Sequence, residues 1–283
     1  MGWSDRDARA KVFEDTRLHY MNDASLKDVV EDSVRGQKLI LEKDATGFDH
    51  SVLNENDTKI VVSRKRSFEA ASEYSKAGLK TAVHNFASST NPGGGVVTGA
   101  GAQEECLCRC STLYPCLDVK EMWDGFYKPH RKTGDPLHNG DIIYTPGVVV
   151  FKTDTALPEM MPEKEWYSVD VITCAAPNLR SDPSNRFNPS DGAKRAEIGN
   201  EALKEIHVQR LSRMLEVAVV KGCEAVILGA FGCGAFRNPP EVAAEAARIA
   251  VDQYGKYFKV IEFAVYCSPN DLSNYSVFNS VFG

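Results

Sequence analysis

The residues best suited to chemistry form an acidic cluster behind a glycine-rich turn. Gly93–Gly95 is followed, after seven residues, by Gln103, Glu104 and Glu105 at the start of an expected helix. Consecutive glycines leave backbone N–H groups open to a ligand, and amides at a helix start suit a diphosphate or an oxyanion. Carboxyl groups beside such a turn can bind sugar hydroxyls and transfer protons. The spacing therefore indicates a site for a sugar that carries an anionic group.

A purely structural explanation of the two glutamates is also available. Acidic residues in the first turn of a helix complement the helix dipole. That explanation suits one glutamate better than the polar run Gln103–Glu105 beside five glycines. Successive helical residues diverge by roughly 100°, so one glutamate can enter a cleft while its neighbour lines the rim.

A second glycine-rich turn, 229–238, lies between an apolar strand and a helix. This is the context in which a glycine turn binds phosphate. Asn238 is expected to cap the helix, with Glu241 completing a capping-box spacing. The turn contains Phe236, which either packs in the core or presents its ring to a ribose.

The eight cysteines include four within residues 106–116, which raises the alternative of a zinc site. Their spacing argues against it, because structural zinc sites combine ligand pairs from two separate segments. We expect small buried thiols and neither a metal nor a cofactor. A hydrolase that uses Cys233 as nucleophile lacks a neighbouring base, and His84 and His207 are expected to be structural.

The apolar patterns predict alternating strands and helices, and hence an α/β fold. The expected helices are 5–20, 25–35, 67–77, a segment from 103 to about 115, 197–220 and 241–254. The expected strands are 37–41, 59–63, 81–86, 169–174, 225–230 and 260–266, with 142–144 and 148–151 as a hairpin or two bent strands. Residues 180–190 are expected to be a polar loop.

Composition and charge limit the partners. The net charge of −6 argues against salt-driven binding along a nucleic-acid backbone, and we expect no sequence-specific nucleic-acid binding. A narrow slot lined by backbone amides can still hold a polyanion. No apolar run reaches the roughly 20 residues of a membrane span, so we expect a cytoplasmic protein that does not bind membranes. We expect a monomer.

The motif Gly93–Gly95 followed by Gln103–Glu105 resembles the GGG…QEE signature of bacterial-type poly(ADP-ribose) glycohydrolases. The stretches 85–95, 175–178 and 229–238 resemble the same family, and the similarity runs from about residue 8 to the C-terminus. The resemblance implies a macrodomain-like mixed sheet flanked by helices, with an N-terminal helical extension. We therefore expect one domain over 1–283, with the extension and edge strands in 1–75 and the macrodomain core in 76–283.

The resemblance also implies roles for the acidic cluster. Glu105 would be the essential acid, Glu104 would hold ribose hydroxyls near the scissile bond, and Gln103 would assist. Asn91, beside the glycines, is expected to contact a ribose.

The two turns would then hold the rest of the bound ADP-ribose unit. Gly93, Gly94 and Gly95 would lie along its diphosphate and distal ribose. The diphosphate would be bound from the other side by the second turn, namely Gly232, Cys233, Gly234, Ala235 and Phe236. Phe263 and Tyr266 are the candidates for stacking on adenine.

The resulting hypothesis is hydrolysis of the ribose–ribose bonds of poly(ADP-ribose), with ADP-ribose as the product. Such a bond breaks through an oxocarbenium-like transition state, and its leaving oxygen needs a proton. Burial of Glu105 beside Glu104 raises a pKa in the required direction. The alternatives are a macrodomain that only binds ADP-ribose, and a hydrolase of mono-ADP-ribose linkages on protein or DNA.

Overall fold

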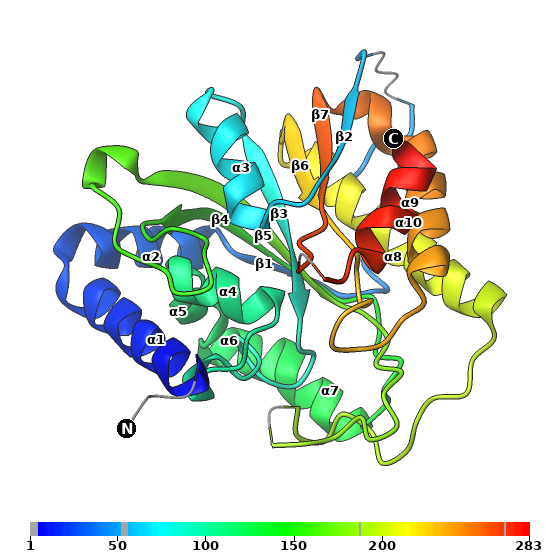
Figure 1. The fold of residues 1–283 in the computed structure, drawn as a ribbon, viewed down its shortest axis with the longest axis horizontal. Helices are drawn as coiled ribbons and strands as arrows, with labels where there is room; N and C mark the ends of the chain where they lie inside the picture. Colours follow the sequence, from blue (N-terminus) through cyan, green and yellow to red (C-terminus); the bar gives the residue numbers. More distant parts are fainter. Residues whose placement is uncertain (1–4, 52–55, 187, 269) are drawn as a thin grey trace.

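The computed structural model describes residues 5–51, 56–186, 188–268 and 270–283. Their strands form one mixed seven-stranded sheet in the order β1-β4-β5-β3-β6-β7-β2 (Figure 1). The strands are β1 (Lys38–Ile40), β2 (Lys59–Ser63), β3 (Thr81–Ala87), β4 (Ile142–Val150), β5 (Tyr167–Ala175), β6 (Ala225–Leu228) and β7 (Val260–Ala264). The five strands β5, β3, β6, β7 and β2 run parallel to one another, whereas β4 is antiparallel to both of its neighbours, β5 and β1. The predicted mixed sheet is confirmed.

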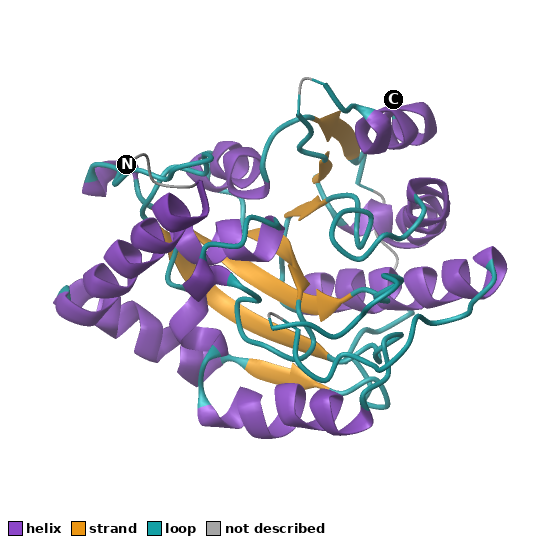
Figure 2. Cartoon of the chain, turned by 60° about the horizontal axis from the view of Figure 1, so that its bottom comes forward, coloured by secondary structure: helices purple, strands orange, loops and turns teal. Residues whose placement is uncertain are grey.

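Helices cover both faces of the sheet (Figure 2). One face carries the C-terminal helices α8 (Asn200–Val220), α9 (Pro240–Tyr254) and α10 (Ser273–Phe282). Their apolar residues share a buried cluster with the facing strands, and Leu211, Ala247 and Phe263 are among its members. Burial of about 25 cal/mol per Å² of apolar surface makes this packing the main force that holds the helices on the sheet.

The opposite face is covered by shorter helices. They are α3 (Ser67–Lys76), α4 (Gln103–Cys110), α5 (Leu113–Leu117), α6 (Lys120–Met122), the π-helical turn η2 (Trp123–Tyr127) and α7 (Lys128–Thr133). The predicted N-terminal helices are present as α1 (Asp5–Asn22) and α2 (Ala24–Gly36). α1 inserts Phe13 into the same buried cluster as Phe68 of α3 and Leu107 of α4. The extension is therefore packed onto this layer.

Two expected segments, 142–151 and the helix that starts at Gln103, differ from those observed. The segment 142–151 is a single strand, β4, with an irregular register between Thr145 and Val148. The helix that starts at Gln103 ends at Cys110, because Ser111 forms a β-bridge with Val150. The hairpin and the longer helix predicted here were therefore wrong.

Helix α10 and the helical stretch 120–133 were not predicted. Helix α10 has only 10 residues, but its Phe278 is fully buried and Phe282 stacks on Phe263 at 4.3 Å between ring centroids. Helix α10 is therefore stabilised by packing against a strand that is distant in sequence, which the local residue pattern does not predict.

The parallel strands end at one edge of the sheet. β3 ends at Ala87, β6 at Leu228 and β7 at Ala264, and each is followed by a loop that contributes to the same pocket. Ligands in parallel sheets bind at such carboxyl ends. None of the helices in the described part of the chain is long and apolar enough to cross a membrane.

Candidate active site

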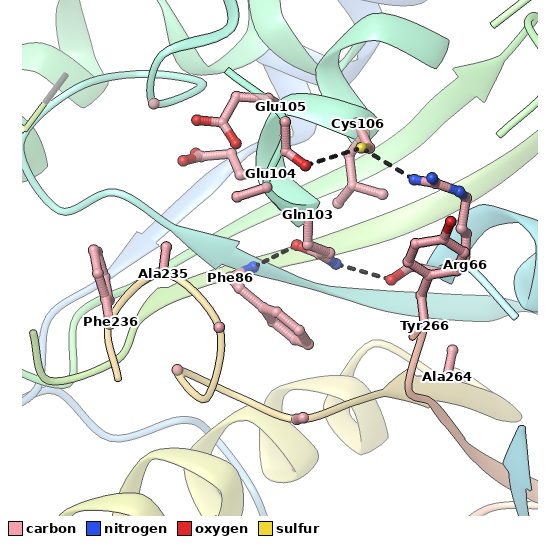
Figure 3. A pocket seen from close by; sticks show the side chains of 18 of the residues that line it. Arg66, Phe86, Gln103, Glu104, Glu105, Cys106, Ala235, Phe236, Ala264 and Tyr266 are labelled. Atoms are coloured by element: carbon pink, nitrogen blue, oxygen red, sulfur yellow. Dashed lines mark hydrogen bonds between the residues drawn. The ribbon is translucent and has the colours of Figure 1, made fainter. Parts of the chain in front are cut away.

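A pocket of about 350 Å³ lies at this edge of the sheet. Its walls are the start of α4, the start of α3, the turn after β6 and the residues that follow β7. Figure 3 shows the Glu104 and Glu105 side chains on the same side of the pocket as Ala235 and Phe236, with Arg66 and Tyr266 toward the other end. The structure therefore brings the two predicted glycine-rich regions together.

Glu104 is buried and both of its oxygens accept hydrogen bonds. Its side chain accepts from the Ser88 N–H at 2.7 Å and from the Asn85 side-chain amide at 3.4 Å. Ser88 is the first residue after β3, so the end of the central strand fixes this carboxyl group. Glu104 is therefore held in one orientation.

Glu105 is also buried, but only one of its oxygens is bound. Oε1 accepts from the N–H of Gly95 at 2.8 Å, whereas Oε2 has no hydrogen-bond partner among the described residues. Neither Glu104 nor Glu105 forms an ion pair within the described ranges. Oε2 of Glu105 is thus a buried, unpartnered polar atom on a residue that lines the pocket, and such atoms are rare without a functional reason.

Gly94 allows both carboxyl groups to approach the turn. A Cβ at this position would lie 2.6 Å from Oε1 of Glu105 and 3.1 Å from Oε2 of Glu104. The φ angle of Gly94 is +56°, a backbone conformation that residues other than glycine rarely adopt. Position 94 therefore requires glycine, because any side chain there would collide with the carboxyl groups of Glu104 and Glu105.

The neighbouring carboxyl group and burial both affect the acidity of Glu104. Burial, and then the negative charge of Glu105, raise the pKa of Glu104 well above its usual range. The hydrogen bonds from Ser88 and Asn85 oppose this shift without cancelling it. Two buried carboxylates side by side cannot both ionise cheaply. Both oxygens of Glu104 already accept hydrogen bonds, whereas Oε2 of Glu105 is open to a further polar group.

Gln103 lines the pocket, but its amide group is engaged by the protein itself. Oε1 accepts from the Phe86 N–H at 2.9 Å, and Nε2 donates to the His84 carbonyl at 2.8 Å and to Ser67 Oγ at 3.0 Å. These bonds tie the start of α4 to β3 and to α3. Gln103 therefore positions the two glutamates that follow it.

The second turn lines the pocket through Gly232, Gly234, Ala235 and Phe236. The Asn238 side chain fixes it from below by donating to the Pro177 carbonyl at 2.7 Å and to the Gly232 carbonyl at 3.1 Å.

The predicted helix cap at Asn238 was wrong, because α9 begins at Pro240 and Pro239 occupies the capping position. The side-chain oxygen of Asn238 instead pairs with Nε2 of His207 at 2.9 Å. Burial lowers the pKa of His207 to about 4, so its ring is neutral and can donate to Asn238. His207 has the structural role expected of it.

Four predicted site residues lie outside the lining of this pocket: Asn91, Gly93, Gly95 and Cys233. Asn91 instead bonds the Gly94 carbonyl and accepts from Arg131 at 3.3 Å. It stabilises the first turn from within, and its contact with a ribose stays a prediction.

The far end of the pocket carries the aromatic residue expected near β7. Tyr266 lines the pocket and is 55% exposed, with the Arg66 guanidinium 3.9 Å from its ring centroid. Phe263, the other candidate, is fully buried against α10. Of the two residues, only Tyr266 is placed where a base could reach it.

Comparisons with known proteins point to one family. A family model described as the catalytic domain of microbial-type PARG, that is poly(ADP-ribose) glycohydrolase, matches residues 13–153. The crystal structure of poly(ADP-ribose) glycohydrolase from Thermomonospora curvata is 28% identical, with a TM-score of 0.82 over 98% of this chain and 100% of that chain. The chain belongs to the microbial-type poly(ADP-ribose) glycohydrolases.

Two further similar structures contain ligands. The Thermomonospora curvata enzyme bound to the inhibitor ADP-HPD is 28% identical, with a TM-score of 0.80 over 98% of this chain and 100% of that one. The Deinococcus radiodurans enzyme in complex with ADP-ribose is 27% identical, with a TM-score of 0.75 over 89% of this chain and 96% of that one. No curated protein sequence matches the chain.

The pocket is also lined and supported by residues that sequence patterns did not indicate. Asn188, from the polar loop 180–190, lines the pocket and its side chain accepts from Ser88 Oγ at 2.6 Å. A buried pair, His138 and Asp191 at 2.7 Å, holds the end of the same loop, and Ser89 donates to that carboxylate at 3.0 Å. These partners are far apart in sequence, so no local signal could have paired them.

The cysteine-rich helix α4 of the glycohydrolase is buried. Cys106 lines the pocket and lies between two guanidinium groups, 3.1 Å from Arg109 and 3.4 Å from Arg66. Cys108 and Cys110 are fully buried and all eight cysteines are free. In the part of the chain that is described, no three His, Cys, Asp or Glu side chains are grouped so as to bind a metal.

Proposed function

We propose that the chain hydrolyses the ribose–ribose O-glycosidic bonds of poly(ADP-ribose) and releases ADP-ribose, with Glu105 as the acid. One observation carries this proposal: Oε2 of Glu105, a residue that lines the pocket, is the only oxygen of the glutamate pair without a hydrogen-bond partner within the described residues. A group that must exchange a proton with substrate needs such a free oxygen. Membership of the glycohydrolase family supports the enzymatic assignment.

The glutamate pair can supply the proton that the reaction consumes. As the glycosidic bond stretches, the ribose gains oxocarbenium character and the leaving 2′-oxygen takes the proton from Glu105. The Gly95 N–H fixes the other oxygen of Glu105 and so aims the free one. A water then attacks the ribose carbon and gives its proton to the same carboxylate, which restores the starting state.

Glu104 supports this cycle by its charge and its position. The two carboxyl groups lie on consecutive residues of one helix, so they do not flank the sugar as the paired acids of most glycosidases do. Burial and the negative charge of Glu105 raise the pKa of Glu104 well above its usual range, so Glu104 favours its protonated form more than a free glutamate does. We propose that it also accepts hydrogen bonds from ribose hydroxyls.

The remaining walls of the pocket suit the rest of an ADP-ribose unit. The diphosphate would lie against the turn of Gly232 and Gly234, and Phe236 would contact the distal ribose. Adenine would lie toward Arg66 and Tyr266, at the opposite end from the acids. The complexes of related enzymes with ADP-ribose and with ADP-HPD support a ligand of this size and chemistry.

Other properties stay proposals from the sequence. We infer a cytoplasmic monomer that comprises one domain with an N-terminal helical extension, and whose sheet is of the macrodomain type. ADP-ribosylated macromolecules are its expected partners, and it requires no cofactor.

The substrate class can be tested with the wild-type protein alone. Purified protein would be incubated with long poly(ADP-ribose), with mono-ADP-ribosylated protein and with mono-ADP-ribosylated DNA, and released ADP-ribose would be quantified. We expect release from the polymer only. Release from a mono-ADP-ribosylated substrate alone would change the assigned linkage, and tight ADP-ribose binding without any release would leave only a binding module.

A further inference from the structure

Three consecutive carbonyl groups in the segment 98–100 each accept a hydrogen bond from an arginine. In the order of the acceptors, the donors are Arg6 at 2.7 Å, Arg9 at 2.8 Å and Arg109 at 2.6 Å. Hydrogen bonds from charged donors are about twice as strong as neutral ones. Two of these donors belong to the first two turns of α1, which are distant from the segment in sequence.

The backbone of α1 also touches this segment directly. A Cβ on Gly99 would lie 1.9 Å from the carbonyl oxygen of Arg6 and 3.1 Å from the backbone nitrogen of Ala10. The φ angle of Gly99 is +74°, which glycine adopts without strain. Only glycine at 99 therefore permits helix and turn to pack this closely.

The clamped segment is rigidly connected to the residue that orients the acid. The N–H groups of Thr98 and Ala100 both donate to the Gly95 carbonyl, at 3.1 and 3.0 Å. On the other side of the same residue, the Gly95 N–H donates to Glu105 at 2.8 Å. A displacement of the segment would therefore move the one N–H group that aims Glu105.

We propose that Arg6 and Arg9 are positioning residues for catalysis, and that α1 clamps the segment 98–100 so that Gly95 holds Glu105 in its reactive orientation. The inference rests on the proposed role of Glu105. The matched part of the family model begins at residue 13, beyond both arginines. In this proposal the N-terminal helix helps to position Glu105 without touching the substrate.

The contacts of Arg9 explain why a guanidinium group is needed. Its Nε bonds the Gly99 carbonyl, and a Cβ on Gly101 would lie 3.3 Å from the same nitrogen. The planar group therefore covers the turn just before Gly101, which lines the pocket. A lysine could restore one hydrogen bond to the carbonyl but not this planar cover.

The test compares R9A, R9K and the double variant R6A/R9A with wild type. Because a misplacement of about 1 Å can cost roughly 100-fold in rate, we expect kcat on poly(ADP-ribose) to fall about 10- to 100-fold in R9A and further in the double variant. KM and the ADP-ribose dissociation constant should stay at wild-type values, and R9K should recover part of kcat. R17A is the matched control, since Arg17 lies on the same helix but pairs with Glu14 at 2.9 Å; its kcat should not change.

Two results would overturn the proposal. Wild-type kcat in the folded double variant would show that the clamp does not affect Glu105. A raised KM with unchanged kcat would make the arginines substrate contacts instead. If the variants unfold, R9K and the melting temperatures separate a loss of fold from a loss of positioning. The two failures can be told apart. If the proposed function is wrong, wild-type protein will not turn over poly(ADP-ribose) at all, whereas if only the clamp is wrong, wild type and variants will turn it over at the same rate.

Discussion

The two glycine-rich turns have similar compositions but are held in different ways. The first turn, 93–101, is bound by charged side chains on both its amides and its carbonyls, namely Glu105, Arg6, Arg9 and Arg109. The second turn, 229–238, is held by main-chain hydrogen bonds and by the neutral side-chain amide of its own Asn238. The first turn is thus bound by charged side chains of the protein itself, whereas the second turn leaves backbone groups facing the pocket.

This difference assigns different tasks to the turns. In the first turn, the amide of Gly95 is already used by Glu105, so the turn serves to aim an acid. In the second, Gly234 lines the pocket and has no atom within 4 Å of the place where a Cβ would be. We therefore propose that the second turn contributes most of the binding energy for the diphosphate, and the first turn most of the rate.

The largest effect that separates the turns is expected for Gly94→Ala. The new Cβ would overlap Oε1 of Glu105 and require a left-handed backbone. We expect kcat to fall by at least about 100-fold because both acids are displaced, with a much smaller change in ADP-ribose affinity. Gly78→Ala is the matched control, since Gly78 has φ +86° but nothing within 4 Å. Equal losses in the two variants would show that backbone strain alone is responsible.

The complementary change in the second turn is Asn238→Ala. It leaves the buried carbonyl of Pro177 and the His207 ring without their side-chain partner, and it removes one of the two hydrogen bonds to the Gly232 carbonyl. We expect the free energy of unfolding to fall by about 1–3 kcal/mol. ADP-ribose affinity should weaken more than kcat does, as measured by calorimetry and steady-state kinetics. A selective loss of kcat would reverse the roles of the two turns.

The anchor of the second turn should also weaken in acid. The pKa of His207 is about 4 in the folded protein and 6.5 in its reference state, so the unfolded chain binds this proton first. Stability from this residue is therefore complete above pH 6.5 and is lost as the pH falls toward 4, by about 1–2 kcal/mol between pH 6.5 and 5. Urea unfolding of wild type and His207→Gln across this range would measure it. Identical slopes would exclude His207 as the cause.

The smallest effect is expected for Gly234→Ala. The position is open and its backbone is not left-handed, so stability should change by less than about 0.5 kcal/mol. A methyl group facing the diphosphate should nevertheless weaken ADP-ribose binding several-fold. Unchanged affinity would place the diphosphate elsewhere in the pocket.

Sequence patterns predicted the sheet and the principal helices, and the family resemblance implied that the two turns face one ligand; residues of both turns line one pocket. These features could be predicted because apolar segments and the glycines after β3 and β6 are local signals. The pocket lies at the ends of these strands. The role of Asn238 and the pairing of His138 with Asp191 depend on residues remote in sequence, which no local pattern encodes. The break after Cys110 was missed for the same reason, since a strand partner, Val150, decides it.

The central claim is that Glu105 transfers the proton while Glu104 and the turns hold it in place. It is tested most directly by Glu105→Gln, which keeps the shape of the side chain and removes the acid. We expect turnover of poly(ADP-ribose) to fall by about 10³-fold or more, with ADP-ribose binding by calorimetry unchanged and with the exposed Glu121→Gln as active control. Wild-type turnover in folded Glu105→Gln protein that still binds ADP-ribose would contradict the account.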